Sequence, residues 1–461
     1  MVIYMIISYI KKLINNSNDY KFREIKVYGE KINYIYNEVL TNSSLINDLI
    51  LKYVVKLNKK ELKNINNYIP NCSSLIIKKK DILNYLNNGY LIIYYKKIFA
   101  FEVKAYLDRG VTTINSELNI GGSKDSFCEN ININLGLIRK RIKNNLISSS
   151  LYIGKITNTK INVLYIDSIC KSSLVKNVIN KLNNINIYGI VDYSYLKQVF
   201  ENNKVFPTVM ITERPDNTVM ALLEGKVIIL VDNSPYALIL PCFFFDFFHT
   251  TDDYYQKSFN TTFIRLIRLV AFLLAIFIPG IYLSVTTRNY NLIPTPLLLM
   301  LKAGRTFVPF PAYIEAIFMI ICFEILRESD LRMSTTSGTA VSILGGLILG
   351  DAAVSAGIVS PIMIIVVAIS SIAGLIFSSF ELVNALRFYK IITLILSVFL
   401  GIYGVIIGAI LLLFNILTTK ICNFRYFNLN NTDKDLIVKK DNLVKFRKST
   451  LTNNIIRGRY K

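Results

Sequence analysis

The sequence predicts an α/β soluble N-terminal region with two subdomains, followed by an all-α membrane domain with several spans. Four stretches without a charged residue lie close together in the second half of the chain: residues 269–287, 334–350, 352–380 and 391–419. A helix needs about 20 predominantly apolar residues to cross the hydrocarbon core of a bilayer. Ten of the 11 prolines lie at or after Pro207, so we expect regular elements before it. Helical and strand-like patterns alternate there, as in α/β domains.

The first subdomain is expected at residues 1–110. Apolar residues at three- and four-residue spacing predict a helix over residues 30–68. Short runs rich in Ile, Tyr and Phe predict strands after it, at residues 74–77, 89–95 and 98–105. A connection near residues 107–130 leads to the next subdomain.

The second subdomain is expected at residues 111–245. A helix is predicted to start near Asn130, and a second one near Ser172 or Ser173, either of which could cap it. A third helix is predicted over residues 194–202. Strand patterns complete the subdomain, at residues 152–156, 162–166, 208–212, 226–231 and 236–240.

The end of the second subdomain carries a group of charged and turn-forming residues. It predicts a charged turn that opens a helix, with an acid in the first turn, and then a break before a strand. We interpret the segment as a rigid joint that passes motion between the soluble and membrane parts. The candidate joint residues are Glu213, Arg214, Pro215, Asp216, Glu224 and Gly225.

The membrane domain is expected at residues 246–419, and its later part is rich in small residues. Such residues let helices approach closely in lipid, which suits packing within the chain, packing between subunits or a narrow pore wall. Asp351 stands between two apolar segments and fits either the mouth of a cation path or an ordinary turn. The candidate pore and packing residues are Gly345, Gly346, Gly350, Asp351 and Gly357.

Charged residues also accompany the apolar runs. Glu315, Glu324 and Arg327 belong to one apolar helix, and the last two can meet because they are three residues apart. They are candidates either for an ion pair at a helix end or for coupling and conduction. Arg265 and Arg268 precede the first long uncharged run and are expected to reach out to lipid headgroups.

Residues 420–461 are predicted to form a basic cytoplasmic tail. They carry 11 Lys or Arg and 3 Asp or Glu, a net charge of +8. Short basic segments beside a membrane span stay on the cytoplasmic side and can rest on anionic lipid. The N-terminal region lacks the pattern of an export signal, so we expect it on the same side. The number of crossings is then even, either four or six.

Patterns typical of enzymes are not found in this sequence. His249 is the single histidine, the six cysteines lie far apart, and Gly121, Gly122 and Ser123 lack the spacing of a phosphate-binding loop. The pair Asp252 and Asp253 is interpreted as a helix cap or a solvent-facing pair. We therefore expect no catalytic residues, no metal and no cofactor. The basic residues are scattered, which argues against a nucleic-acid partner.

Several motifs occur in an order that is similar to one known family. They are "LGLIRKRI" (135–142), "YIGKITNTKINVLYI" (152–166), "TERPDNTVMALLEGKVIILVDNSPYALILP" (212–241), "IPTPLL" (293–298), "VPFPAYIEA" (308–316), "FEILRE" (323–328) and "AVSILGGLILGDAAVSAGIVSP" (340–361). Together they resemble the GerA-type family of A subunits of bacterial spore germination receptors. The resemblance covers roughly residues 115–420.

This resemblance implies a place and a role. Family members lie in the inner membrane of the dormant spore, with the N-terminal domain facing the core. They work with a transporter-like B subunit and a lipoprotein C subunit. The A subunit is expected to form a homo-oligomeric ring around an ion path, which opens when a small nutrient germinant is sensed and so triggers germination.

Three alternatives stay open at this point. The chain could be a solute transporter that binds a small nutrient directly, because proline-broken helices suit a transporter. It could be a scaffold that gathers receptor subunits. It could also be an accessory ion channel that amplifies germination.

Overall fold

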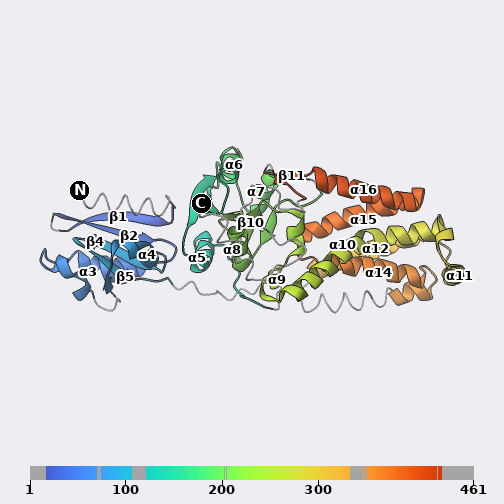
Figure 1. Cartoon of the computed structure of the whole chain (residues 1–461), viewed down its shortest axis with the longest axis horizontal. Helices are drawn as coiled ribbons and strands as arrows, with labels where there is room; N and C mark the ends of the chain where they lie inside the picture. The colour runs from blue at the N-terminus through green and yellow to red at the C-terminus, as the bar shows by residue number, and fades with distance from the viewer. Residues whose placement is uncertain are drawn as a thin grey trace.

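The structure is a computed structural model that describes residues 17–427, apart from residues 28, 70–73, 106–120, 202, 204, 333–345, 347–349 and 423. Three parts follow one another along the long axis: one sheet with short helices, a second sheet with longer helices, and a bundle of helices (Figure 1). This order confirms the predicted fold class. Gly345, one of the candidate pore residues, lies outside the described residues.

The first sheet has five antiparallel strands in the order β1-β2-β4-β5-β3. Its apolar residues form two cores, one on each face. The strands are β1 (Tyr20–Val27), β2 (Glu30–Asn37), β3 (Ser74–Ile76), β4 (Tyr90–Tyr95) and β5 (Lys97–Glu102). Short helical segments cover them: α2 (Ser43–Leu45), η1 (Ile46–Leu51), α3 (Lys52–Val54), η2 (Glu61–Asn67), η3 (Lys79–Asp81) and α4 (Ile82–Leu86).

The prediction of one helix over residues 30–68 is wrong for its first part. Residues Glu30–Asn37 form strand β2, which pairs with β1 around a tight turn at Gly29, whose φ is +79°. Ile32 and Ile35 are buried, and their three-residue spacing also fits a helix. The Ile and Tyr residues of this segment favour strands, and the β1 partner decides between the two periods.

The second sheet also has five antiparallel strands, in the order β6-β7-β9-β10-β8. Helices α5 and α8 share one apolar core with the sheet, and α6 and α7 share the other. The strands are β6 (Leu146–Ile153), β7 (Thr159–Ile166), β8 (Met210–Thr212), β9 (Val227–Val231) and β10 (Ala237–Leu240). The helices are α5 (Ile131–Arg141), α6 (Ser172–Asn183), α7 (Tyr193–Phe200) and α8 (Pro215–Leu223).

Two cap predictions in this subdomain have different outcomes. The side chain of Asn130 accepts a hydrogen bond from the Asn132 backbone N–H at 2.9 Å, so the predicted start of α5 is confirmed. The predicted cap of α6 is wrong, because its N-cap residue is Lys171, whose side chain makes no capping hydrogen bond.

The third part contains the apolar helices. Two of them, α10 (Ser258–Thr287) and α15 (Phe380–Leu400), are long and apolar enough to cross a membrane. Two shorter apolar helices accompany them, α14 (Pro361–Leu375) and α16 (Ile402–Thr418). Large apolar side chains on α16 face outward, with Tyr403 at 69% and Phe414 at 65% exposure, as expected of a surface that meets lipid. The remaining elements here are η4 (Phe244–Phe248), α9 (Asp252–Tyr255), η5 (Tyr290–Leu292), α11 (Thr295–Ala303) and α12 (Ala312–Arg332).

The sequence predicts a basic tail from residue 420 onward. The first residues of this tail are folded against the rest of the protein. Strands β11 (Lys420–Ile421) and β12 (Phe424–Arg425) form a small hairpin. The side chain of Tyr426 is fully buried beside Phe206 and Phe244. This hairpin therefore ties the end of α16 to the second subdomain.

Candidate functional site

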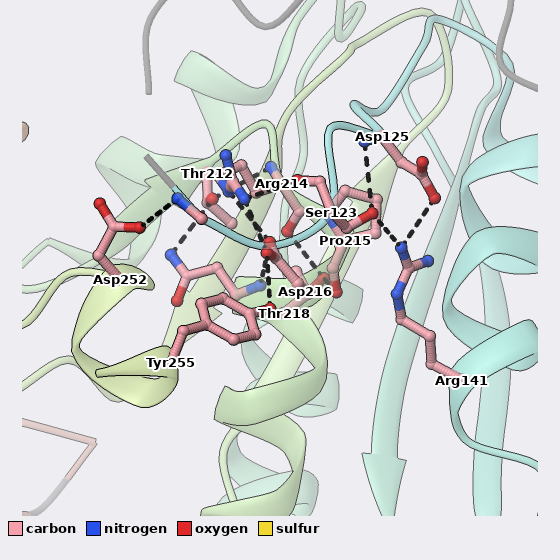
Figure 2. A network of polar contacts seen from close by, with 12 residues as sticks. Ser123, Asp125, Arg141, Thr212, Arg214, Pro215, Asp216, Thr218, Asp252 and Tyr255 are labelled. Carbon is pink, nitrogen blue, oxygen red and sulfur yellow. Dashed lines mark hydrogen bonds and ion pairs between the residues drawn. The ribbon is translucent and has the colours of Figure 1, made fainter. Parts of the chain in front are cut away.

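The buried arginine Arg214 organises the segment that the sequence marked as a joint. It precedes α8 in extended conformation, and Pro215 occupies the first turn, where its missing N–H costs nothing. Its guanidinium binds the Asp216 carboxylate with two hydrogen bonds, Nε to Oδ1 at 3.0 Å and Nη2 to Oδ2 at 2.7 Å. Nη2 also donates to the Ser123 carbonyl oxygen at 2.8 Å (Figure 2). The joint is thus bound to a loop that lies 91 residues earlier in the chain.

That loop is held in turn by Arg141 at the end of α5. Its Nη2 donates to Ser123 Oγ at 2.9 Å and to Asp125 Oδ2 at 2.8 Å (Figure 2). Burial raises the pKa of Asp125, but the hydrogen bond and charge of Arg141 outweigh this and keep that pKa below its ordinary value. Helices α5 and α8 therefore share one polar network through the loop between them.

Helix α9 continues this network toward the membrane part. The Tyr255 hydroxyl donates to Asp216 Oδ2 at 3.3 Å, and Asp252 Oδ1 accepts from the Gly121 backbone N–H at 3.1 Å (Figure 2). The Tyr254 hydroxyl donates to Glu224 at 2.8 Å. Burial and the nearby Glu224 charge raise the pKa of Tyr254 well above its ordinary value, so it stays a donor.

Asp253, on the same short helix, binds both arginines of the first membrane helix. Arg265 Nε donates to Asp253 Oδ2 at 3.0 Å, and Arg268 Nη1 lies 3.1 and 3.0 Å from the two carboxylate oxygens. Burial raises the pKa of Asp253, but hydrogen bonds and charge from Arg268 and Arg265 outweigh it and lower the pKa. The prediction that the arginines reach out to headgroups is therefore wrong. Of the two alternatives for the acidic pair, a place at a helix start fits, because both acids lie in the first turn of α9, whereas Asp253 does not face solvent.

The break between α8 and β9 is formed by Gly225 and followed by a buried cation. Gly225 has a φ of +87°, and a Cβ there would lie 3.2 Å from the Ile169 carbonyl oxygen. Lys226 Nζ lies 2.7 Å from Asp246 Oδ2 and 3.3 Å from Glu224 Oε2. Burial lowers the pKa of Lys226, but the charges of Asp246 and Glu224 outweigh it and raise that pKa well above its ordinary value.

Further contacts connect the second subdomain to the last two membrane helices. Lys197 of α7 forms an ion pair with Glu381 in the first turn of α15. The Asn203 side-chain amide donates to Asn415 Oδ1 and Thr419 Oγ1, both at 2.5 Å, at the end of α16. An aromatic cluster fills the space between these links, and it includes Phe206, Phe244, Phe248, Phe272, Phe377, Tyr389 and Tyr426. Among the predicted joint residues, Asp216 and Glu224 contact α9, whereas the links to α15 and α16 come from Lys197 and Asn203.

The predicted pore residues are not gathered in one place. Gly346 lines a cavity beside α12 and α15, whereas Asp351 is exposed on a helical segment. Gly357 has a φ of +64°, and a Cβ there would lie 3.0 Å from the Phe307 carbonyl oxygen. Gly350 has open space around the position of a Cβ. The four candidate residues that the structure describes thus have different surroundings within one protomer.

Glu315 and Glu324 lie on α12 but have different surroundings. Glu315 is buried, pairs with Arg305 at 2.9 Å, and accepts hydrogen bonds from the backbone N–H and Oγ of Ser360, each at 2.9 Å. Glu324 pairs with Arg387 of α15 at 3.0 Å. Arg327 lines the same cavity as Glu324, of about 210 Å³.

A larger polar cavity, of about 560 Å³, lies between the two subdomains and was missed in the sequence. Strand β1 forms one side, with Asp19 and Lys21, and strands β6 and β7 form the other, with Ser150 and Lys160. Arg139 of α5, buried to 99%, forms an ion pair with Asp19 at its edge. The "IRKR" run at the end of α5 could have indicated this cavity. An arginine that is buried in a helix needs an acidic partner, and that partner had to come from a distant part of the chain.

Groups of His, Cys, Asp and Glu that could hold a metal ion are absent from the residues that the structure describes. The interactions described at this site are ion pairs and hydrogen bonds.

The chain is similar to known proteins over nearly its whole length. The family model for the Bacillus/Clostridium GerA spore germination protein matches residues 8–452. The chain is 31% identical over 464 residues to "Spore germination protein GerQA" of Bacillus cereus, covering 98% of this chain and 93% of the relative. It is 34% identical over 435 residues to "Spore germination protein KA" of Bacillus subtilis (strain 168), covering 91% and 79%. The solved N-terminal domain of the A subunit of the Bacillus megaterium spore germinant receptor GerK3 matches with 26% identity and a TM-score of 0.40, covering 52% of this chain and 94% of that one.

Proposed function

Because this chain belongs to the Bacillus/Clostridium GerA spore germination protein family, as the A subunit of a spore germination receptor, we propose that it forms an oligomeric ion channel opened by a nutrient germinant. The single observation that carries this proposal is a pair of polar groups that meet on helix α9, one leading to the loop at Ser123 and the other to the membrane helix α10. Asp216 and Asp253 are the acidic centres of the two groups, and Arg214 and Arg268 their main partners.

The mechanism is a shift between two populations. A ligand can change the equilibrium between closed and open states only if it binds one of them more tightly. A germinant signal that moves the second subdomain is passed to α10 through Asp253, and to α15 through the ion pair of Lys197 with Glu381. Buried ion pairs suit this role because they keep a defined geometry while two packed parts move.

The proposed placement follows from the ends of the membrane unit. The start of α10 binds Asp253 of α9, which is itself hydrogen-bonded to the second subdomain, and the end of α16 contacts Asn203 of that subdomain. These two ends therefore lie on one side, which supports an even number of crossings. We place that side toward the spore core, with the unit in the inner membrane. The domain limits proposed are residues 1–110, 111–245 and 246–419, with a basic tail at 420–461.

The proposed partners are those of the receptor complex: a transporter-like B subunit, a lipoprotein C subunit and further copies of this chain. The outward-facing apolar residues of α16 supply surface for lipid or for such subunits. Membrane charges at Glu315, Glu324 and Arg327 are candidates for coupling, and Gly345, Gly346, Gly350, Asp351 and Gly357 for the pore or for helix packing between subunits.

Cation flux into sealed vesicles tests the channel. The complete receptor complex is reconstituted, and flux is followed with an ion-sensitive dye before and after addition of the germinant. We expect flux only with the germinant and with this chain present. A complex that binds the germinant and contains every subunit, yet never raises flux, contradicts the channel and leaves a scaffold.

A second candidate function is direct binding of a small molecule by this chain. The polar cavity of about 560 Å³ favours it, because ligand sites usually have about 300–1,000 Å³. Its mixed lining of Asp19, Lys21, Lys160 and amide side chains suits a zwitterion or a sugar. Binding of a labelled amino acid or sugar to the chain without its partners, abolished by Lys160→Gln, supports this function. Binding that requires another subunit assigns recognition to that subunit.

A further inference from the structure

The cavity of about 210 Å³ in the helical part is unusual in its charges. It lies between α12, α14 and α15, and three basic and two acidic side chains line it: Arg327, Arg387, Lys390, Glu324 and Asp330. Ala275 of α10 lines it too, seven residues beyond Arg268. Seven residues correspond to about 10 Å of helix, so the cavity lies near the joint-side border of the uncharged stretch of α10.

The acidic side chains do not compensate these cations. Glu324 Oε2 lies 3.0 Å from Arg387 Nε, so these two side chains form an ion pair. The Lys390 side chain is 93% buried, yet its Nζ is 3.9 Å from Glu324 Oε1, too far for a hydrogen bond. Arg327 forms no ion pair within the described part of the chain, although the charges of Glu324 and Glu328 lie near it. Three cations and two carboxylates thus line the cavity, so its lining keeps a net positive charge.

Such an arrangement is costly unless an anion completes it. A charge removed from water needs a partner within hydrogen-bond reach, and charges at membrane depth are expensive. A cation would meet net positive charge here, whereas a phosphate oxygen could bind both Lys390 and Arg327. The electrostatics of the cavity thus select an anion.

The remaining lining indicates what carries the anion. Apart from its charged and small residues, the cavity is lined by apolar side chains, among them Phe323, Leu326, Ile372 and Leu375. Ile372 and Leu375 are also exposed on the outer surface of α14, at 63% and 61%. The cavity therefore adjoins the surface that meets lipid tails.

We propose that this cavity binds the headgroup of an anionic phospholipid, with the phosphate at Lys390 and Arg327 and an acyl chain along Phe323 and Ile372. Basic pockets between membrane helices bind such headgroups by the same chemistry. A free phosphate ion shares the charge but has no acyl chain. The bound lipid fixes α12 against α15, and so sets the position of α15 relative to the Lys197 and Glu381 link.

The sequence contains no tryptophan, which allows a clean test. Phe323→Trp places one reporter in the cavity of the full-length protein. Phe388→Trp places a control beside Arg387 on α15, where the side chain is 49% exposed. Each is reconstituted in phosphatidylcholine vesicles that contain a minor fraction of brominated phosphatidylglycerol or, for comparison, of brominated phosphatidylcholine. Bromine quenches tryptophan only on contact.

We expect brominated phosphatidylglycerol to quench the Phe323→Trp reporter several-fold more strongly than brominated phosphatidylcholine, and the control reporter equally. Adding Lys390→Gln or Arg327→Gln should reduce the preference about fivefold each. Lys302→Gln on α11 removes the same charge elsewhere and should leave the preference unchanged.

Equal quenching of the cavity reporter by both lipids overturns the proposal. So does a loss of preference with Lys302→Gln as large as with Lys390→Gln. Inorganic phosphate tests whether the cavity binds a soluble anion instead of a lipid. If it stabilises the protein in pure phosphatidylcholine, and no lipid preference is seen, the cavity binds a soluble anion and the lipid site is refuted. A preference that persists in excess phosphate supports the lipid.

Discussion

Arg268 of the first membrane helix contacts both carboxylate oxygens of Asp253, at 3.1 and 3.0 Å, and Asp253 lies on the short helix α9 that precedes α10. The same arginine donates to the Phe248 carbonyl oxygen at 2.7 Å. One side chain thus fixes the start of α10 to the segment that leaves the second subdomain. A movement of that segment must displace α10 or break a buried ion pair.

The first prediction concerns this ion pair. Asp253→Asn keeps the shape of the side chain but removes the charge that balances Arg265 and Arg268, so both remain buried without a counter-ion. We expect a loss of about 3 kcal/mol in stability and a marked loss of germinant-dependent flux. Thermal unfolding in detergent and vesicle flux measure the two effects. Asp351→Asn, an exposed acid at another helix, is the control and should change stability little.

The second prediction is a dependence on acidic pH. The pKa of Asp253 and that of Asp125 are lowered in the folded protein by their arginine partners. Their pairing therefore stabilises the fold above the unfolded value of about 3.9, and this contribution is lost as the pH falls through the folded values. We expect Tm to fall steeply below about pH 4. In the Asp253→Asn variant, Tm should fall less steeply with decreasing pH. An unchanged slope of Tm against pH in that variant would contradict the role of Asp253 in the acid dependence.

The third prediction concerns the break between α8 and β9. Gly225→Ala introduces a side chain at a φ of +87° and a Cβ contact of 3.2 Å with the Ile169 carbonyl oxygen. Gly29→Ala is matched, because its φ is +79° but nothing lies within 4 Å. The backbone penalty of about 1–2 kcal/mol applies to both, so Gly225→Ala should lower Tm further. Equal losses would mean that the contact with Ile169 relaxes at no cost.

The fourth prediction concerns the packing of α15 against α16. A Cβ at Gly404 would lie 2.1 Å from the Leu396 carbonyl oxygen, whereas nothing lies within 4 Å of one at Gly374. Gly404→Ala must therefore push the two helices apart. We expect Gly404→Ala to lower Tm strongly. We also expect it to make the hairpin of β11 and β12 accessible to protease when the protein is in vesicles. Gly374→Ala should behave like the unchanged protein, and a normal protease pattern for Gly404→Ala would exclude the tight contact.

Local patterns in the sequence correctly indicated many elements. The Asn130 cap located the start of α5, and the β4 and β5 strands were predicted from their Ile, Tyr and Phe content. Residues 30–37 were predicted incorrectly because their spacing fits two periods, and only pairing with β1 distinguishes them. The sequence marked six residues as a candidate joint, but it did not indicate that Arg214 would contact Ser123 or that Asp216 would contact Tyr255.

By itself, the sequence determined that long uncharged stretches follow a mixed α/β region, and that the motifs belong to one family. These properties depend on composition and on spacing along the chain. The tertiary structure alone decided which charges meet, such as Arg139 with Asp19 and Arg268 with Asp253. The physical reason is that a buried charge without a partner is costly wherever it lies in the chain. Each buried charge therefore pairs with an opposite charge that is near it in the folded protein, and the spacing of residues along the sequence does not show which charge that is.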